Sequence, residues 1–446
     1  MAEYDNLYSE DVGSFFRSPV REIFKKVDLN SIYSFAGGYP SAETFPLDLI
    51  RQTMSDVIDK YAGKAFQYGA TQGVPELREA VAARYGVPVE RVQITSSSQQ
   101  GIDVCTRVLV NPGDVILTSS PSYLGALQSF CSYRAKIVGV PHCSDIQEYK
   151  TTFESSVNAV LKEGSKIKFL YMIPDFQNPS GESQTLEERE MLVALAEKYG
   201  FLIVEDSPYR ELRYEGEHIP TMYSLAPDRV IHLGSFSKIF APGFRLGWAI
   251  AHPDILDKIY VCKQSLDLCP PIFDQYVAAE FLESGRLDAN LTRSIELYKG
   301  KRDLLLRLLE EHMPEGVSWT HPEGGLFLFL TMPEGFDAVR FYDKALEALD
   351  QATKGGVPGA TKADVNNMYL MAIREITAKR MSAAEFAVWQ GEQDVADSLI
   401  AVTNELITTY DVALDTGIAR IMKSYLLTLD KKLCSKRQDE LDAYVY

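Results

Sequence analysis

The sequence lacks the cysteine pairs that build disulfide frameworks and zinc sites. Its six cysteines are scattered along the chain, and no two of them form a Cys-x-x-Cys pair. They are Cys105, Cys131, Cys143, Cys262, Cys269 and Cys434. This usage is typical of reduced thiols in a cytosol, so we expect neither structural disulfides nor a metal site.

Long apolar runs and a secretory leader are also missing. No stretch reaches the roughly 18 consecutive apolar residues of a membrane span. The first residues, Met1-Ala-Glu-Tyr-Asp5, contain neither a basic nor an apolar segment. We therefore expect a cytoplasmic protein that has no membrane partner.

Positive charge is in short supply. The 446 residues include 45 Lys and Arg against 62 Asp and Glu, which gives a formal net charge of −17. Because nucleic acids and anionic membranes bind basic surfaces, this excess of acidic residues argues against both as partners. We expect the acidic surface to keep the protein soluble. The length is sufficient for two or three domains.

The sequence is rich in short apolar runs that are followed by polar or glycine-containing turns. These runs end near Thr95, Thr118, Ile173, Val204 and Leu233. They alternate with helical patterns, which predicts an α/β fold with a mostly parallel sheet flanked by helices. Open sheets of this kind bind ligands just beyond the carboxyl ends of their strands, and most candidate residues fall there.

Residues 233–248 contain the strongest candidate chemistry. A buried strand leads into a turn punctuated by Gly and Pro, and this turn presents Ser235, Ser237 and Lys238. A lysine at a strand end can form a Schiff base with an aldehyde cofactor, and the two hydroxyls with Arg245 can hold the cofactor's phosphate. The alternative is a solvated loop lysine and a surface arginine.

The apolar run 201–204 leads to a second candidate, Asp206, with Tyr209 three residues later. A carboxylate at this position would keep a pyridine nitrogen protonated, which makes the ring an electron sink. Tyr209 would hydrogen-bond the phenolic oxygen of the same ring. Alternatively, Asp206 simply caps a short turn.

Two further turns could approach a ligand. Residues 91–103 indicate a strand, a small-residue turn and a helix start, where free N–H groups form an anion site, so Ser98 and Gln99 are candidate phosphate contacts. An ordinary capped helix is the alternative. The Gly/Pro turn at 35–40, which includes Gly38, would let backbone approach a substrate closely, or it is a plain turn.

These motifs resemble, in the same chain order, those of the class I/II aminotransferases of fold type I. The resemblance covers roughly residues 12 to 345 and includes the Ser-x-Ser-Lys stretch and Pro322-Glu-Gly-Gly-Leu-Phe327, which matches a strand of the family's small domain. Phe176-Gln-Asn-Pro-Ser-Gly181 resembles the 2-aminoadipate/kynurenine aminotransferase group most closely. Several separate matches are far more specific than any single short motif.

The resemblance implies a cofactor, pyridoxal 5'-phosphate (PLP), bound at Lys238. It implies that Tyr123 stacks on the pyridine ring and that Asn178 donates its amide to the phenolic oxygen. In relatives, the tyrosine at the place of Tyr68 reaches the cofactor phosphate of the neighbouring subunit, so a homodimer is implied. Lys238 would also move a proton from the substrate as general base.

The implied reaction transfers an amino group from an amino acid to a 2-oxo acid such as 2-oxoglutarate. The donors implied are 2-aminoadipate-like, glutamate or aromatic amino acids. We expect a large PLP-binding domain at 46–285, a smaller α+β domain made of 1–45 and 286–375, and a divergent helical C-terminal extension at 376–446.

The sequence departs from the family where an arginine should clamp the substrate α-carboxylate. Tyr369 stands at that place, and a tyrosine cannot replace a bidentate guanidinium. Arg374, five residues later, is a candidate replacement. The resemblance to the 2-aminoadipate group makes Arg17 a candidate for binding a distal substrate carboxylate; alternatively, Arg17 only faces water.

Because of Tyr369, other outcomes stay open: another PLP carbanion reaction, as in a lyase, racemase or decarboxylase, or a catalytically silent PLP-binding protein. A PLP-sensing transcription regulator is a further alternative. Regulators of that kind carry a winged-helix DNA reader before the PLP domain, and here the resemblance begins near residue 12, so we expect none.

Overall fold

The computed structural model describes residues 7–8 and 37–336. The chain divides into two units, and Gly38–Pro333 forms one of them, here named the sheet unit. Most of the predicted small domain and all of the predicted extension at 376–446 lie outside the described residues. The predicted boundaries at 46 and 285 stay predictions.

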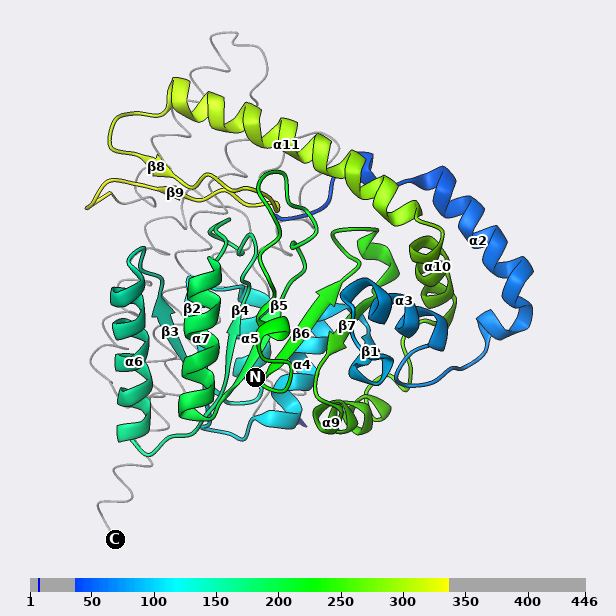
Figure 1. Cartoon of the computed structure of the whole chain (residues 1–446), viewed down its shortest axis with the longest axis horizontal. Helices are drawn as coiled ribbons and strands as arrows, with labels where there is room; N and C mark the ends of the chain where they lie inside the picture. The colour runs from blue at the N-terminus through cyan, green and yellow to red at the C-terminus, as the bar shows by residue number, and fades with distance from the viewer. Residues whose placement is uncertain (1–6, 9–36, 337–446) are drawn as a thin grey trace. The chain divides into compact units, whose positions relative to one another are not determined.

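A seven-stranded sheet runs through the sheet unit in the order β1-β7-β6-β5-β4-β2-β3 (Figure 1). Its strands are β1 (Val92–Thr95), β2 (Val115–Ser120), β3 (Lys136–Pro141), β4 (Ile167–Met172), β5 (Leu202–Asp206), β6 (Val230–Ser235) and β7 (Gly247–Ile250). The pairs β2–β3, β2–β4, β4–β5 and β5–β6 are parallel. Only β7 within this sheet runs antiparallel to its neighbours, β6 and β1. The predicted mostly parallel sheet is confirmed.

Helices connect the strands and flank the sheet (Figure 1). They are α2 (Leu47–Tyr61), α3 (Pro75–Tyr85), α4 (Ser97–Leu109), α5 (Leu124–Ser132), α6 (Ile146–Lys162), α7 (Leu186–Tyr199), α8 (Met222–Leu225), α9 (Pro253–Gln264), α10 (Ile272–Glu283) and α11 (Arg286–His312). Short 3-10 helices are η3 (Ala42–Thr44), η4 (Ala62–Phe66), η5 (Val89–Arg91) and η6 (Pro242–Phe244). Among the described residues, no helix combines the length and the apolar content that crossing a membrane requires.

Alternate residues of the strands join two separate apolar clusters. On β4, Leu170 belongs to one cluster and Tyr171 to the other, and on β5 Ile203 and Val204 divide in the same way. A period of two with both sets buried is expected of a sheet that is covered on both faces. Side chains of α6 and α7 complete the first cluster, and those of α4, α5 and α9 complete the second.

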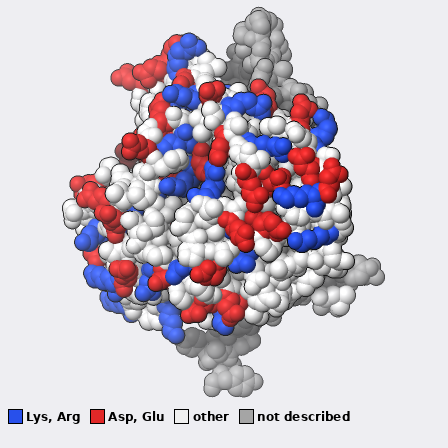
Figure 2. All heavy atoms as spheres, turned by 45° about the vertical axis from the view of Figure 1, so that its right-hand side comes forward, with Lys and Arg blue, Asp and Glu red and all other residues white. Residues whose placement is uncertain are grey.

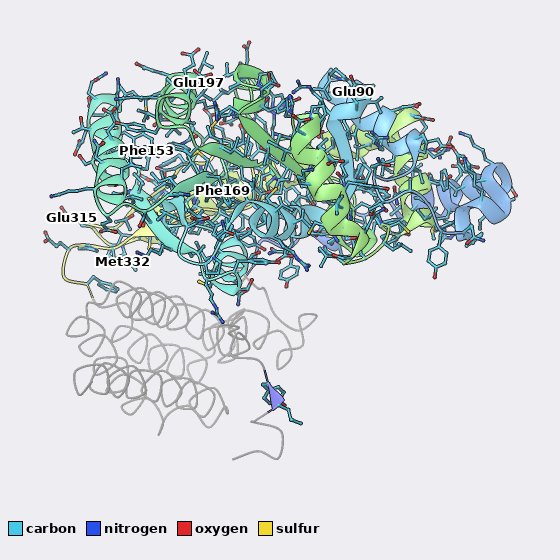
Figure 3. All side chains as sticks on the ribbon, turned by 90° about the horizontal axis from the view of Figure 1, so that it is seen from below. Glu90, Phe153, Phe169, Glu197, Glu315 and Met332 are labelled. Atoms are coloured by element: carbon cyan, nitrogen blue, oxygen red, sulfur yellow. The ribbon has the colours of Figure 1, made fainter. Side chains whose placement is uncertain are left out.

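Figure 3 shows this layering through its labelled side chains. Phe153 of α6 and Phe169 of β4, one from each cluster, lie inside the sheet unit. The exposed Glu197 of α7 points outward. The helices therefore turn their apolar sides to the sheet and their charged sides to solvent.

Local sequence signals set the ends of several helices. Thr185 and Glu188 form a capping box at the start of α7, which ends at Gly200 with φ of 77°. Helix α3 starts with Pro75 in its first turn and ends at Gly86 with φ of 63°. Proline at the start and a left-handed glycine at the end satisfy or avoid the unpaired backbone groups of helix termini.

Residues 322–330 are not the strand that the motif predicted. Gly324 forms a single isolated bridge with Arg213, and a regular strand, β9 (Leu330–Thr331), begins only at the end of the segment, where it pairs with β8 (Ser318–Trp319). The preceding residues lie along the loop after β5: the Tyr214 N–H donates to the Glu323 carbonyl (2.7 Å), and the Gly325 N–H donates to the Leu212 carbonyl (2.9 Å). A loop thus provides the hydrogen-bond partners that a neighbouring strand would have provided.

Acidic and basic side chains are interspersed on the face shown in Figure 2. Because both signs are mixed there, this face presents no field of one sign to a partner. Charged side chains also pair between elements: Arg302 Nη2 lies 2.7 Å from Glu215 Oε1, and Lys301 Nζ lies 2.9 Å from Glu43 Oε1. Exposed pairs of this kind add little stability.

Candidate functional site

The predicted cofactor residues gather at one edge of the sheet. Strands β1, β2, β4, β5 and β6 run in the same direction, so their carboxyl ends meet at this edge (Figure 1). The residues that follow these ends are Ser98 and Gln99 in the first turn of α4, Tyr123 before α5, Asn178 after β4, Asp206 and Tyr209 at and after the end of β5, and Ser235, Ser237 and Lys238 at and after the end of β6.

Asp206 is the last residue of β5, and its side chain is withdrawn from water. It is 2% exposed, and one of its oxygens, Oδ2, accepts a hydrogen bond from the Tyr171 hydroxyl (2.8 Å). Its other oxygen, Oδ1, is buried without a hydrogen-bond partner among the described residues. Burial raises the pKa of Asp206 to about 7, although the bond from Tyr171 acts in the opposite direction. Oδ1 is therefore a buried acceptor that a ligand N–H would satisfy.

Lys238 lies just after β6 and is also largely buried. Its Nζ donates to the Gly38 carbonyl (2.5 Å) and lies 5.8 Å from the centre of the Tyr209 ring. Burial, followed by the nearby charge of Arg245, lowers the pKa of Lys238 to about 8. A substantial fraction of this amine is thus neutral near pH 7 to 8, and only the neutral amine can act as a nucleophile or base.

The loops after β4 and β5 bring Tyr209 and Asn178 together. The Asn178 side chain hydrogen-bonds the Tyr209 hydroxyl, and burial raises the pKa of that hydroxyl well above its ordinary value. The ring of Phe327 packs edge-on against Tyr209, with 5.3 Å between the ring centres. A Cβ on Gly38 would collide with the Phe327 ring, which explains why a glycine stands there. Phe327 thus joins Gly38 and Tyr209 in one packed group.

Gln99 and Tyr123 contact each other across the site. The Tyr123 hydroxyl donates to Gln99 Oε1 (3.1 Å), and Gln99 Nε2 donates to the Gly125 carbonyl (3.0 Å). The amide therefore holds the phenol end of the Tyr123 ring in place. Tyr123 also lies near enough to Tyr171 and Tyr209 to influence the ionisation of both hydroxyls.

Arg245 and the first turn of α4 form a polar group beside Lys238. Arg245 Nη2 donates to the Ser97 hydroxyl (2.5 Å), and the Ser237 N–H donates to Ser235 Oγ (3.2 Å). Ser97 has φ of 72°, which is uncommon for a residue with a side chain. Gly247 lets this turn approach closely, because a Cβ on Gly247 would contact Ser97 C at 2.7 Å. One guanidinium, several hydroxyls and a helix N-terminus suit an anion such as a phosphate.

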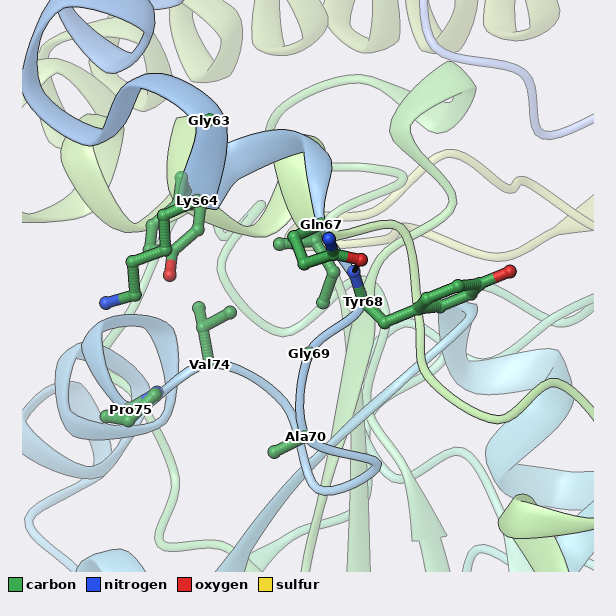
Figure 4. A pocket seen from close by; sticks show the side chains of 10 residues that line it. Gly63, Lys64, Gln67, Tyr68, Gly69, Ala70, Val74 and Pro75 are labelled. Atoms are coloured by element: carbon green, nitrogen blue, oxygen red, sulfur yellow. Dashed lines mark hydrogen bonds between the residues drawn. The ribbon is translucent and has the colours of Figure 1, made fainter.

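Tyr68 lies at the surface of the sheet unit. Its side chain is 80% exposed, and it lines a cavity of about 420 Å³ together with Gly63, Lys64, Val74 and Tyr276. Figure 4 shows its ring pointing away from the other lining side chains. Its backbone N–H donates to Gln67 Oε1 (2.9 Å).

Three residues named for the substrate side, Arg17, Arg374 and Tyr369, lie outside the described residues. Gly38 alone of the predicted substrate residues is described, and it contacts Lys238. The choice between Arg374 and another carboxylate clamp therefore stays a prediction.

Two contacts that sequence reasoning missed complete the geometry. Tyr171 provides the hydrogen bond to Asp206, and Ser97, rather than Ser98, contacts Arg245. Tyr171 could have been found from strand parity, because Tyr171 and Val204 join the same cluster and Asp206 follows Val204 by two positions. The three consecutive serines at 96–98 contain no signal that tells one from another.

Comparison with known proteins gives a consistent result. The family model "Aminotransferase class I and II" matches residues 36–361. The chain is 43% identical to aromatic-amino-acid aminotransferase 1 of Thermococcus litoralis over 77% of this chain and 84% of that protein. It is 34% identical to 2-aminoadipate transaminase of Thermus thermophilus, over 79% and 88%. The crystal structure of Pyrococcus horikoshii kynurenine aminotransferase in complex with PMP superposes with a TM-score of 0.72 at 40% identity, over 81% of this chain and 89% of that chain.

Proposed function

Because the chain belongs to the class I and II aminotransferases, we propose that it binds PLP through Lys238 and moves an amino group from an aromatic amino acid, 2-aminoadipate or glutamate to a 2-oxo acid. Transamination itself follows from the family and is the chain's activity. The cofactor site, the substrates and the assembly are the proposed part.

The observation that carries this proposal is the buried, unpartnered Oδ1 of Asp206. A buried acceptor without a donor costs free energy, and the protonated ring nitrogen of PLP would provide that donor. Tyr171 holds the other carboxylate oxygen and so fixes the direction in which Oδ1 can accept. The residues of this site therefore fit the ring end of the cofactor.

The opposite end of the site fits a phosphate. Arg245 contacts Ser97, the first residue of α4, and this helix start has no side-chain cap. Ser235 pairs with Gly247, which lies against the same turn, and its Oγ accepts from the Ser237 N–H. The first N–H groups of that helix and the guanidinium would hold a dianion by hydrogen bonds and charge. An acceptor for the ring nitrogen at Asp206 and donors for the phosphate near α4 support this orientation of PLP.

When bound, PLP supplies an aldehyde carbon that condenses with amines and a ring that withdraws electrons from the bond being broken. The rest of the chemistry belongs to side chains. Lys238, with its pKa lowered to about 8, would hold the cofactor, and its free neutral amine would take a proton from the substrate carbon. Asp206 would hold the proton on the ring nitrogen. Tyr209 and Asn178 would donate hydrogen bonds at the phenolic oxygen and orient the ring.

The exposure of Tyr68 supports a homodimer in which this ring enters the neighbouring active site. An aromatic ring that is 80% exposed makes few contacts within its own chain. Phe66, 67% exposed and stacked on Phe273 at 5.3 Å, adds apolar surface beside it. Mixing inactive Lys238→Ala subunits with inactive Tyr68→Ala subunits should restore part of the activity, because each hybrid dimer then contains one intact site. Failure to restore activity in proven hybrids would contradict the trans assignment.

The decisive experiment is reduction of the PLP-loaded protein with borohydride, followed by peptide mass spectrometry. The cofactor mass is expected on the peptide that contains Lys238. Lys238→Ala should abolish turnover with 2-aminoadipate, glutamate and aromatic donors, whereas Lys198→Ala, an exposed lysine on α7, should retain it. Label on another lysine, or normal turnover of Lys238→Ala, would reject the proposed site.

A further inference from the structure

The hydroxyl that precedes helix α4 points away from the helix. Serine before a helix usually accepts a hydrogen bond from the first-turn N–H groups. Ser96 occupies this position, yet it makes no side-chain cap, and its Oγ instead donates to Asp267 Oδ2 (2.9 Å). By contrast, Asp145 caps α6 and Thr185 caps α7 in the ordinary way.

Asp267 belongs to a polar group of four side chains, here named the Lys263 cluster, of which Lys263 is buried and the other three are partly buried: Ser96, Gln100, Lys263 and Asp267. Lys263 Nζ donates to Gln100 Oε1 (2.8 Å) and lies 3.1 and 3.2 Å from the two Asp267 oxygens. Gln100 Nε2 donates to Asp267 Oδ2 (2.7 Å). The Gln100 amide can be placed in only one way, because its Oε1 faces two donors, Lys263 and the Ser96 N–H (2.8 Å).

The Lys263 side chain is fully buried, which is rare for an ammonium group. Burying this charge is unfavourable, and the loss is offset only because the carboxylate and the amide surround it. Burial lowers the pKa of Lys263, and Asp267 acts against that shift. No step of the proposed transamination uses this lysine, so its burial calls for another explanation.

The cluster adjoins the proposed phosphate site. Ser97, the next residue after Ser96, accepts a hydrogen bond from Arg245. The turn is therefore fixed from both sides, by Asp267 at Ser96 and by Arg245 at Ser97. Between these two contacts the backbone adopts the positive φ of Ser97, and the helix begins with uncapped N–H groups.

We propose that Asp267, held by Lys263 and Gln100, keeps the Ser96 hydroxyl off the first-turn N–H groups of α4 and thereby leaves those groups open for the cofactor phosphate. This inference rests on the proposed function. Without Asp267, the Ser96 side chain would rotate into the cap position and compete with the phosphate for the same donors. Lys263 and Asp267 are thus positioning residues that act through Ser96.

The test compares apoprotein binding of PLP with binding of pyridoxal, which lacks the phosphate. Asp267→Ala should weaken PLP binding roughly tenfold, the scale of one capping interaction, and should leave pyridoxal binding unchanged. Since Asp267→Ala leaves the Lys263 charge unpaired, the double variant Lys263→Met/Asp267→Ala provides a version without a buried unpaired charge. It should show the same loss. Asp257→Ala, on the exposed side of the same helix as Lys263, is the matched control and should change neither affinity.

A rescue experiment tests the role of the Ser96 hydroxyl directly. Ser96→Ala alone should bind PLP as the wild type does, and Ser96→Ala combined with Asp267→Ala should recover most of the lost PLP affinity. A combined variant as weak as Asp267→Ala, or an equal loss for PLP and pyridoxal, would overturn the proposal. If the wild type binds PLP at Lys238 and these variants keep the wild-type ratio of PLP affinity to pyridoxal affinity, only this inference is rejected. Wild-type protein that does not bind PLP at all removes the proposed function.

Discussion

Two buried carboxylates, Asp206 at the end of β5 and Asp175 just after β4, behave in opposite ways. Asp175 is fully buried like Asp206, but Arg189 Nη2 lies 2.8 Å from its Oδ1 and Arg210 Nη1 lies 3.2 Å from its Oδ2. Although burial by itself would raise the pKa of Asp175, the two arginines hold it below its ordinary value. Asp206 has one neutral donor, and its pKa is raised to about 7.

The difference shows that burial alone does not identify a functional carboxylate. Asp175 has its charge neutralised by residues of the fold, so it joins the β4 loop to α7 and to the loop after β5. Asp206 leaves one oxygen without a partner in the described structure and so has capacity left for a ligand. The number of unfilled acceptor sites, rather than depth, separates the two.

The sharpest way to break this comparison is to neutralise Asp206. Under the proposed function, Asp206→Asn should lower the transamination rate at least about 10²-fold to 10³-fold, since it would remove the charge that is proposed to keep the ring nitrogen protonated. The folded structure should survive, because a neutral side chain suits a dry site. Steady-state kinetics together with circular dichroism measure both parts. An active Asp206→Asn variant would mean that the ring does not depend on this carboxylate.

The same substitution at Asp175 should have the reverse effect. Asp175→Asn leaves the fully buried Arg189 without its counter-charge, so the free energy of unfolding should fall by about 3–5 kcal/mol. The rate per folded, PLP-loaded molecule should change only a few-fold. Urea unfolding and active-site titration test the two statements separately. Loss of activity without loss of stability would mean that Asp175 acts in the active site, and the distinction between a structural Asp175 and a functional Asp206 would fail.

The pH dependence of stability should also distinguish the two carboxylates. Because the folded-state pKa of Asp206 is raised to about 7, the folded apoprotein holds a proton that the unfolded chain releases near pH 4. The unfolding free energy should therefore fall by a few kcal/mol as pH rises from about 4 to 7, and then level off. Asp175 has a lowered pKa, so its carboxylate stabilises the folded state at neutral pH. Its contribution to the unfolding free energy should be lost only as pH falls below about 4.

Urea unfolding of apoprotein at pH 5, 6, 7 and 8 measures this trend, and Asp206→Asn is the control. The difference in unfolding free energy between wild type and Asp206→Asn isolates this carboxyl from all other titrating groups. A difference that stays constant from pH 5 to pH 8 would contradict the raised pKa.

The smallest expected effect comes from Tyr171, the only donor to Asp206 among the described hydrogen bonds. Tyr171→Phe keeps the ring in its apolar cluster and removes the hydroxyl, so the pKa of Asp206 should rise further. We expect roughly a tenfold loss in kcat, on the scale of one hydrogen bond to a charged group. The acid limb of the pH–rate profile should move to higher pH. An unchanged profile would show that Tyr171 only fills space.

The sequence was informative wherever the chemistry is local. Asp206 and Lys238 could be named because each follows an apolar strand and each lies within a short motif, and the structure brings both to the same edge of the sheet. Their roles in binding PLP stay predictions. The direction of the strands could be predicted from the alternation of apolar runs with helical patterns.

Contacts between distant segments could not be read in the same way. The bond from Tyr171 to Asp206 depends on the pairing of β4 with β5, and the bond from Ser96 to Asp267 joins α4 to the chain after α9. The segment that starts at Pro322 was expected to be a strand because its motif matches one in the family's small domain, yet Glu323 and Gly325 find their backbone partners in a loop at 212–215. A local sequence pattern predicts the secondary structure that a segment favours. Which distant segment it then contacts is determined by the tertiary structure.

The uncapped start of α4 has a consequence for how long the protein survives in a cell. A helix without a side-chain cap is held less firmly, so an anion bound at that end would stabilise the folded chain. Molecules without cofactor should open locally more often and be degraded faster by proteases. The amount of this enzyme would then follow the supply of its cofactor without any change in its synthesis.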